Sequence, residues 1–429
     1  MRLLYSFVCC LSLPIVLLRL WVRGRQEPGY RQHITERLGS YSNYRHQKTI
    51  WVHAVSAGET RAAEPLVRAL LLRYPEHHLI LSHMTPTGRA TGTILFADIA
   101  DRITQVFVPY DISFIVQRFL KHYSPSLCAL IETEVWPNLV AQCKQAGVPV
   151  ALVNARLSEK SLKKALKLSS LILPAAQAIT CVAAQSGPDA ARLKMLGVSN
   201  LSVTGNMKFD VTPPDHMAEN GARLRHWLGD RQIFLCASTR DGEEELLLKA
   251  FVANRRRDKS NTLLVITPRH PQRFDQVGTM LTQHGLSFVR RSRMDLTIQE
   301  NPLSASVDVV LGDSMGEMYM YYAACDLAFV GGSLVNLGGH NLIEACAMAK
   351  PVLTGPYTFN FSEITEQAIA AKAAQRVANS EDLFQQAWAL LDQPNTLNSM
   401  GQNAHAFFMQ HQGATNRTMA MLENFINIS

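Results

Sequence analysis

Five charged side chains lie where apolar segments end, and they have the chemistry needed to move a proton or hold an anion: Glu59, Glu132, Glu134, Lys208 and Arg269. A carboxylate can accept the proton of a substrate hydroxyl as that hydroxyl attacks another molecule. A lysine can stabilise an anion, and the planar guanidinium of arginine can bind a phosphate through two parallel hydrogen bonds. These residue types predict a site that activates a hydroxyl beside an anionic substrate.

Most of these side chains also have a structural interpretation. Glu59 ends the pattern Ser-Ala-Gly-Glu, which is a capping box at the start of a helix. Glu132 and Glu134 are two residues apart after a buried segment and share a face, so we expect Lys208 or Arg156 to balance them. Lys208 also fits a solvated loop lysine.

A glycine-rich segment, residues 329–344, predicts an anion site. Its sequence, Phe-Val-Gly-Gly-Ser-Leu-Val-Asn-Leu-Gly-Gly-His-Asn-Leu-Ile-Glu, predicts a buried strand, a turn and the first turn of a helix beginning near Gly339. Free backbone N–H groups and a helix start attract a phosphate, and Asn341 and Glu344 could bond sugar hydroxyls. The alternative is a flexible turn without a ligand. No Gly-x-Gly-x-x-Gly pattern fits this segment, which argues against a nicotinamide dehydrogenase.

The sequence contains neither His-Glu-x-x-His nor Asp-x-Asp, so we expect no metal. We interpret His53, His270 and His340 as packing or hydrogen-bonding residues. The eight cysteines form no Cys-x-x-Cys pair and mostly fall in apolar runs. This pattern predicts a reduced protein that faces the cytosol.

The segments that position these residues alternate between apolar runs and helical patterns from Thr49 onward. This alternation is typical of parallel sheets covered by helices, and 429 residues suffice for two cores. We therefore expect two Rossmann-like α/β domains whose strand ends face a central cleft, one half for a donor and one for an acceptor. The expected divisions are 1–25 for a membrane anchor and basic flank, 26–210 for an N-terminal domain, 211–220 for a linker, 221–395 for a C-terminal domain and 396–429 for a helical C-terminal segment.

The first 50 residues carry most of the net charge, because eight basic side chains stand against Glu27 and Glu36, which gives +6 of the chain's +7. They flank Leu3–Leu18, an uncharged apolar run of 16 residues. As a helix this run is about 24 Å long, against about 30 Å of bilayer hydrocarbon. Charge beside an apolar segment favours an anionic membrane surface over nucleic acid. The run predicts an anchor that spans the bilayer or lies in its interface, with the following residues in the cytoplasm.

Eight blocks in order resemble the Kdo (3-deoxy-D-manno-octulosonic acid) transferases of lipopolysaccharide synthesis: His53–Thr60, Met84–Gly88, Glu132–Asn138, Asn154–Leu157, Gly205–Asp210, Pro268–His270, Met315–Glu317 and Gly338–Glu344. The resemblance covers nearly the whole chain, including the apolar N-terminal run. It implies a GT-B fold and an inverting glycosyltransferase without a cofactor. The implied reaction moves Kdo from CMP-Kdo to a 6′ hydroxyl of tetra-acylated lipid A precursor (lipid IVA) at the bacterial inner membrane.

On the family pattern, Glu59 matches the general base, and Glu132 and Lys208 match residues that stabilise the transition state. The implied CMP contacts are Pro268, Arg269, Met315, Gly316, Glu317, Asn341, Leu342, Ile343 and Glu344. Two other functions stay open on the residues alone. One is a GT-B transferase that uses a nucleotide-diphosphate sugar on another membrane lipid, and the other is a membrane-tethered binding module without catalysis.

Overall fold

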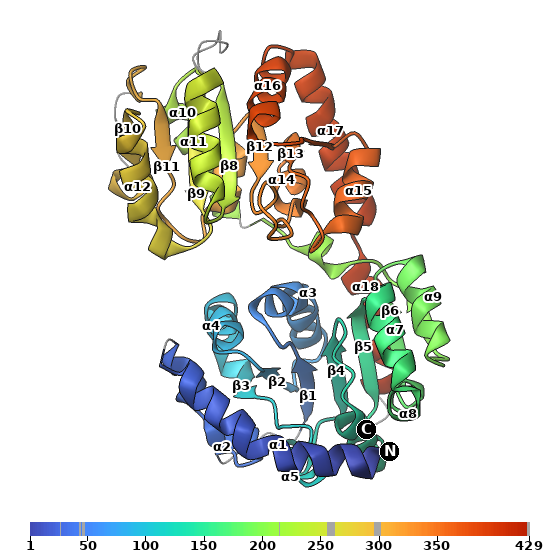
Figure 1. Ribbon diagram of the computed structural model, residues 1–429. Helices are drawn as coiled ribbons and strands as arrows, with labels where there is room; N and C mark the ends of the chain where they lie inside the picture. The colour runs from blue at the N-terminus through green and yellow to red at the C-terminus, as the bar shows by residue number, and fades with distance from the viewer. Residues whose placement is uncertain are drawn as a thin grey trace. The chain divides into compact units, whose positions relative to one another are not determined.

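The chain forms two α/β units in this computed structural model, which describes residues 1–25, 27–42, 44, 48–213, 215–254, 262–295 and 302–426 (Figure 1). Unit 1 comprises Met1–Val211 and His411–Ser429, and unit 2 comprises Thr212–Gln410. Each unit is built on a seven-stranded parallel sheet. The predicted class of two parallel-sheet α/β units is confirmed.

Unit 1 has the strand order β3-β2-β1-β4-β5-β6-β7, and all neighbours are parallel. Its strands are β1 (Thr49–His53), β2 (His78–His83), β3 (Ile103–Phe107), β4 (Leu127–Ile131), β5 (Val150–Ala155), β6 (Cys181–Ala184) and β7 (Leu201–Val203). Alternate residues of β1 pack into two cores, Trp51 into one and Ile50 and Val52 into the other. A strand buried on both faces needs a continuous apolar run, which is what the sequence provides.

The helices that cover this sheet connect successive strands, as a parallel sheet requires. They are α3 (Ala57–Arg73), α4 (Pro86–Leu95), α5 (Ser113–Tyr123), α6 (Pro137–Gln145), α7 (Glu159–Lys167), α8 (Ser169–Gln177) and α9 (Gly187–Met195). The chain returns to unit 1 at its end, where α18 (Ala414–Ile426) buries Leu422 in the same core as Ile50.

The apolar N-terminal run forms α1 (Arg2–Arg23), which lies along unit 1 (Figure 1). Ser6 Oγ donates a hydrogen bond to Asn138 Oδ1 at 3.0 Å, so one face of α1 contacts the start of α6. Large apolar side chains on its other face are between 61% and 84% exposed: Leu3, Phe7, Leu11, Ile15 and Leu18. Among the described residues, α1 is the one helix that is long and apolar enough to cross a bilayer.

Unit 2 repeats the architecture with the order β10-β11-β9-β8-β12-β13-β14, again all parallel. Its strands are β8 (Ile233–Thr239), β9 (Leu263–Pro268), β10 (Phe288–Arg290), β11 (Val309–Leu311), β12 (Leu327–Val330), β13 (Val352–Thr354) and β14 (Ala374–Arg376). Its helices are α10 (Asp215–Leu228), α11 (Glu243–Asn254), α12 (Phe274–Gln283), α13 (Met318–Ala324), α14 (Ile343–Ala347), α15 (Ser362–Ala370), α16 (Ser380–Leu391) and α17 (Pro394–His411).

The boundaries of the units differ in detail from the expected divisions. The chain passes from unit 1 to unit 2 after Val211, but α10 begins at Asp215, inside the segment 211–220 expected as a linker. The segment 396–429 is helical over its described part, yet it is divided, because α17 belongs to unit 2 and α18 to unit 1. The carboxylate of Asp210 fixes this return by accepting the Gly413 N–H at 2.6 Å.

Candidate functional site

Three of the predicted site residues lie at the carboxyl edge of the sheet in unit 1. Glu59 lies in the first turn of α3, which follows β1, and Glu132 directly follows β4, the neighbour of β1. Lys208 lies in the short turn Met207–Asp210, which follows β7. Its Nζ is 2.8 Å from Glu132 Oε1, and both side chains are about one-fifth exposed. The structure therefore brings Glu132 and Lys208 together.

The backbone of Glu132 is held in a costly conformation. Its φ is 61°, in the left-handed region that residues with a side chain rarely occupy. The Glu132 N–H donates to the Val153 carbonyl at 3.0 Å, which ties this residue to the neighbouring strand β5. Strain of this kind persists only where the surroundings fix the backbone, and it is common at functional sites.

Glu134 has a different partner from Glu132. Its Oε2 accepts a 2.6 Å hydrogen bond from Trp136 Nε1. Burial raises the pKa of Glu134, the Trp136 hydrogen bond opposes that change, and the nearby charge of Glu132 adds to it. The expectation that a cation balances the pair is thus correct for Glu132, while an indole N–H serves Glu134.

Glu59 takes part in the predicted helix cap. Its Oε2 accepts the Val55 N–H at 2.8 Å, its Oε1 accepts the Ser56 hydroxyl at 3.2 Å, and Ser56 Oγ accepts the Glu59 N–H at 3.4 Å. Burial and, to a smaller extent, the charges of Glu134 and Glu132 raise the pKa of Glu59 to about 7, although the Val55 hydrogen bond opposes the rise. A carboxyl group with this pKa exists in both protonation states near neutral pH, which suits it to accept a proton.

A buried polar chain lies under this edge of the sheet. Trp51 Nε1 donates to Ser82 Oγ at 2.7 Å, and Ser82 Oγ is 2.9 Å from His53 Nδ1. Burial lowers the pKa of His53 to about 3, so the ring is neutral. The Trp136 ring stands perpendicular to it at 5.8 Å, and this packing fixes the indole that holds Glu134.

In unit 2, the predicted nucleotide-binding segments follow β9, β11 and β12 at the carboxyl end of the parallel sheet. The Arg269 N–H donates to the Thr239 carbonyl at 2.9 Å, which places Arg269 beside the end of β8. Burial, together with the cationic side chains of Arg269 and Arg240, lowers the pKa of His340 to about 4. These interactions bring the segments after β8, β9 and β12 to one place.

The glycine-rich turn differs from its prediction. The N–H groups of Gly332, Ser333 and Leu334 donate to the buried carboxylate of Glu243 at 2.7, 3.1 and 3.0 Å. The Gly339 N–H donates to the Gly332 carbonyl at 2.8 Å. The prediction that the first Gly-Gly pair offers free N–H groups to a phosphate is therefore wrong, because a side chain of the protein already supplies the anion.

The predicted helix start is also displaced. Helix α14 begins at Ile343, four residues after Gly339, and it has only five residues. Asn341 Oδ1 accepts the Ile343 N–H at 3.0 Å, so the asparagine side chain caps the helix. Leu342 and Ile343 are buried, and only their backbone atoms could therefore reach a ligand. Glu344 lies in the first turn of α14.

The loop after β11 presents its residues differently. The Met315 side chain is 54% exposed, and Gly316 has a φ of 83°, which favours glycine. Glu317 is held inside unit 2, because its Oε1 lies 2.8 Å from Arg291 and its Oε2 accepts the Ser314 hydroxyl. Pro268 is the last residue of β9 and precedes Arg269. No cluster of three His, Cys, Asp or Glu suited to a metal ion occurs in the described part of the chain.

From the sequence, Trp136 is identified only within the block Glu132–Asn138, and Glu243 is not identified. Trp136 is two residues from its partner Glu134, so a local pattern could have found that contact. Glu243 is about 90 residues before the turn it fills, and only the neighbouring positions of β8 and β12 bring them together. Nothing in the local sequence signals that contact.

Residues 32–211 match the family described as 3-Deoxy-D-manno-octulosonic-acid transferase (kdotransferase), and residues 243–407 match glycosyl transferases group 1. A 3-deoxy-D-manno-octulosonic acid transferase of Bordetella pertussis is 41% identical over 424 residues, covering 96% of each chain. The Haemophilus influenzae protein of the same name is 35% identical over 431 residues, covering 99% of each.

A solved structure of a putative UDP-N-acetylglucosamine 2-epimerase from Listeria monocytogenes matches with a TM-score of 0.59 at 16% identity. It covers 89% of this chain and 97% of its own, and this likeness concerns the fold alone. The predicted GT-B class is confirmed. With both halves matched to glycosyltransferases and two relatives aligned along almost the full length, the chain belongs to the 3-deoxy-D-manno-octulosonic acid transferases.

Proposed function

We propose that this chain transfers Kdo from CMP-Kdo to a hydroxyl of tetra-acylated lipid A precursor, with release of CMP and inversion at the anomeric carbon. The observation that carries the proposal is the group Glu59, Glu132 and Lys208 at one sheet edge of unit 1. It combines a carboxyl group whose pKa is about 7 with an ion pair of fixed geometry, in a chain that belongs to this family.

Glu59 is proposed as the general base. Each of its oxygens accepts one hydrogen bond from the cap, from Val55 or Ser56. A carboxylate oxygen can accept two, so each keeps a position for the acceptor hydroxyl. The cap fixes the rotamer of Glu59, and a fixed base loses less entropy when the substrate binds. The helix cap and the catalytic role are thus compatible.

Glu132 and Lys208 are proposed to stabilise charge during transfer. The anomeric carbon becomes more positive as its bond to the phosphate breaks, and a carboxylate placed beforehand stabilises that charge. Lys208, 2.8 Å from Glu132, holds that carboxylate in place and supplies a cation for the departing phosphate.

Unit 2 is proposed to bind the donor through the segments after β9, β11 and β12. Arg269 supplies a guanidinium that can bind the phosphate of CMP with two hydrogen bonds. The backbone around Gly316, Asn341 and Leu342 is proposed to bind the nucleoside. Departure of CMP as an anion then needs no metal ion, because arginine provides the positive charge.

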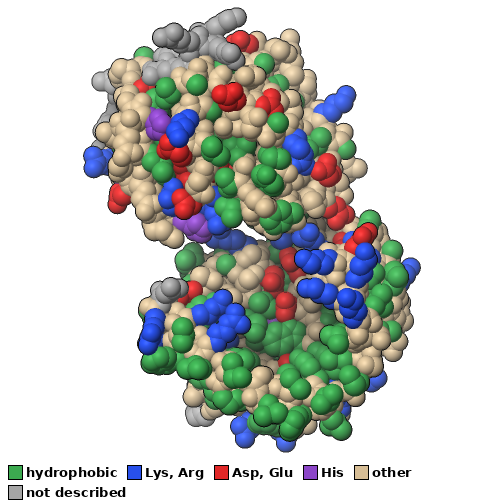
Figure 2. Space-filling view, in the orientation of Figure 1, with side chains coloured by type: hydrophobic (Ala, Val, Ile, Leu, Met, Phe, Trp, Pro, Cys, Tyr) green, Lys and Arg blue, Asp and Glu red, His purple; other side chains and the backbone are tan. Residues whose placement is uncertain are grey.

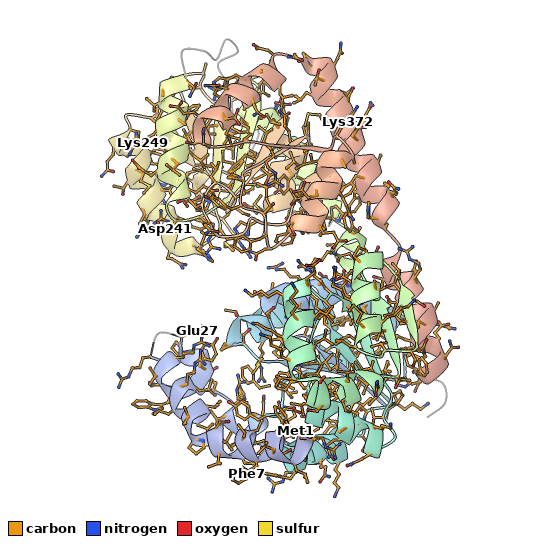
Figure 3. All side chains as sticks on the ribbon, turned by 45° about the vertical axis from the view of Figure 1, so that its right-hand side comes forward. Met1, Phe7, Glu27, Asp241, Lys249 and Lys372 are labelled. Carbon is orange, nitrogen blue, oxygen red and sulfur yellow. The ribbon has the colours of Figure 1, made fainter. Side chains whose placement is uncertain are left out.

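We also propose that α1 lies in the interface of the inner membrane, on its cytoplasmic side. The bond from Ser6 to Asn138 holds one face of α1 on unit 1, and a spanning helix would have to break it. The exposed apolar side chains of the other face fit the acyl region of a leaflet. Figure 2 shows hydrophobic side chains gathered at the lower end of unit 1, where α1 lies in Figure 1. Met1 and Phe7, labelled in Figure 3, mark the first two turns. This placement would bring the enzyme to its lipid acceptor.

The proposal is tested by incubating the purified full-length chain with CMP-Kdo and lipid A precursor and measuring CMP release and product mass. We expect turnover by the wild type and a loss of at least 100-fold in kcat for Glu59→Gln, because this removes the base. Glu64→Gln, on the same helix and paired with Arg68 at the surface, is the matched control and should retain activity. Full turnover by Glu59→Gln would remove the base from the mechanism. Competition by UDP but not CMP would indicate a nucleotide-diphosphate donor, and an absence of turnover with lipid acceptors would indicate a binding module.

A further inference from the structure

We propose that Arg240 binds the carboxylate of the donor sugar while Arg269 binds the donor phosphate, so that Arg240 selects an acidic sugar. This inference rests on the proposed function, since it assigns a role within the same donor site. It concerns a residue that the family pattern of CMP contacts given above does not include. It would make the enzyme distinguish CMP-Kdo from CMP itself.

Two arginines follow neighbouring strands. Arg240 comes directly after β8 and Arg269 directly after β9, and these strands are hydrogen-bonded neighbours. Adjacent strands are about 4.8 Å apart, and the Arg269 N–H contacts the Thr239 carbonyl. Burial lowers the pKa of His270, and the charges of Arg240 and Arg269 both lower it further, so both guanidinium groups act on the same imidazole.

Acidic residues next to Arg240 in sequence have other partners. Asp241 lies 2.8 Å and Glu244 3.1 Å from the guanidinium of Arg273. From Arg240, Glu243 accepts the backbone N–H, at 3.2 Å, and nothing from the side chain. Together with the three N–H groups of the glycine-rich turn, this bond fills both oxygens of Glu243. Within the described ranges, no carboxylate forms an ion pair with the Arg240 side chain. Its positive charge is therefore available for a ligand.

Several other described arginines of unit 2 differ from Arg240 in this respect. Carboxylates within 3.3 Å pair with five of them: Arg225, Arg273, Arg290, Arg291 and Arg376. When an arginine pairs with a carboxylate of its own protein, that carboxylate already neutralises the guanidinium charge. An arginine at a strand end with no such partner among the described residues is instead suited to an external anion.

The absence of a side chain at Gly332 lets Arg240 and His340 approach the backbone of the turn closely. A Cβ added at Gly332 would lie 3.5 Å from Arg240 Cγ and 3.0 Å from His340 Nε2, so the glycine lets both side chains pack over the turn. His340 Nε2 is buried and has no hydrogen-bond partner among the described residues. The pKa of His340 is lowered to about 4, so this neighbour adds no competing charge. Asp241, labelled in Figure 3, marks this end of unit 2.

The chemistry of the donor fits two cations side by side. In CMP-Kdo the anomeric carbon carries both the phosphate oxygen and the carboxyl group of the sugar acid. The two anions are thus separated by only a few bonds. A nucleotide sugar without the carboxylate would leave the Arg240 charge desolvated and unpaired, which disfavours that ligand.

The test is equilibrium binding of CMP and of CMP-Kdo to the full-length chain, measured by calorimetry without lipid acceptor. We expect Arg240→Gln to lower the affinity for CMP-Kdo at least tenfold, since a charge-assisted pair is lost, and to change the affinity for CMP less than twofold. Arg269→Gln should weaken both ligands. Arg240→Lys, which keeps the charge but not the planar fork, should fall between wild type and Arg240→Gln for CMP-Kdo. Lys249→Gln, an exposed charge on α11 that is labelled in Figure 3, is the matched control and should bind as wild type does.

The outcomes separate the inference from the proposed function. An equal loss of affinity for CMP and for CMP-Kdo in Arg240→Gln would overturn the inference, because Arg240 would then act on the nucleotide part or on the fold. Unchanged affinity for CMP-Kdo in both Arg240 variants would also overturn it. A wild type that binds neither ligand would instead refute the proposed function. Thermal melting of each variant identifies any that fails to fold, and Arg240→Lys then provides the comparison.

Discussion

Replacing the proposed base should make the protein more stable at alkaline pH while it removes activity. Burial and two neighbouring carboxylates raise the pKa of Glu59 to about 7 from an ordinary value of 4.5. The folded chain therefore holds this proton more tightly than the unfolded chain. That contribution to stability is fully present below pH 4.5 and is lost as the pH rises through 7.

The magnitude follows from the pKa values of the two states. A displacement from 4.5 to about 7 corresponds to about 3.4 kcal/mol in total. Of this, about 2.5 kcal/mol is lost between about pH 5 and about pH 8. In Glu59→Gln the amide carries no charge, and its oxygen can still accept the Val55 N–H that the carboxylate accepts at 2.8 Å. Between about pH 5 and about pH 8, we therefore expect the free energy of unfolding of the variant to fall by about 2.5 kcal/mol less than that of wild type.

Hydrogen exchange measured by mass spectrometry gives this quantity for unit 1 separately from unit 2. Peptides from β1 and β4 report the opening of the buried sheet, after correction for the intrinsic exchange rate at each pH. Glu64→Gln, whose carboxylate pairs with Arg68 at the surface, should keep the wild-type dependence on pH. Parallel pH dependences for Glu59→Gln and wild type would refute the reasoning, because Glu59 would then not carry a raised pKa.

Four further changes test other contacts. Lys208→Met should lower kcat about 100-fold because it removes the cation beside Glu132, and Lys208→Arg should restore part of it; steady-state kinetics decides. Glu134→Gln should move the acid limb of kcat/KM below its wild-type pKa of about 7, since one neighbouring charge disappears while the amide oxygen still accepts from Trp136; an unmoved limb in the pH profile would contradict this. Glu243→Ala should destabilise unit 2 by at least about 3 kcal/mol because it leaves the N–H groups of the glycine turn unpaired, as thermal melting would show. Phe7→Glu with Leu11→Glu should lower the fraction bound to anionic vesicles in a flotation assay, whereas Leu72→Glu, at an even more exposed side chain on α3, should not.

The sequence predicts the central strands and two of the four edge strands, β3 and β10. The apolar runs Leu127–Ile131 and Leu327–Val330 predict β4 and β12 with the observed bounds, because both faces of each strand are buried and the whole segment must be apolar. Strands β7 and β14 were not predicted. Both lie at an edge of their sheet, and residues such as Gln375 and Arg376 are polar because one side of an edge strand meets water.

Positions at strand ends were predictable, and so were the helix cap of Glu59 and Lys208 as a candidate partner of Glu132, but the contacts of Glu243 were not. Parallel topology places Glu132 and Arg269 at the carboxyl edges of their sheets, and the apolar runs were enough to infer that. Which partner each side chain takes depends on segments far away in sequence. Lys208 is 76 residues from Glu132, and it could be named as a partner because both follow strands of the same sheet. Glu243 is about 90 residues from the turn it fills, and no local pattern encodes that pair.

Two glutamates at strand ends illustrate how hydrogen bonds separate structural from chemical roles. Both Glu59 and Glu243 lie in the first turn of a helix that follows a strand, and burial raises the pKa of each. The carboxylate of Glu243 accepts four backbone N–H groups, two on each oxygen, so no acceptor position is left for a substrate. Glu59 accepts one bond on each oxygen and has the charges of Glu132 and Glu134 nearby. A carboxylate that the backbone saturates can only hold the fold together, whereas one that is half satisfied and repelled by its neighbours gains from accepting a proton.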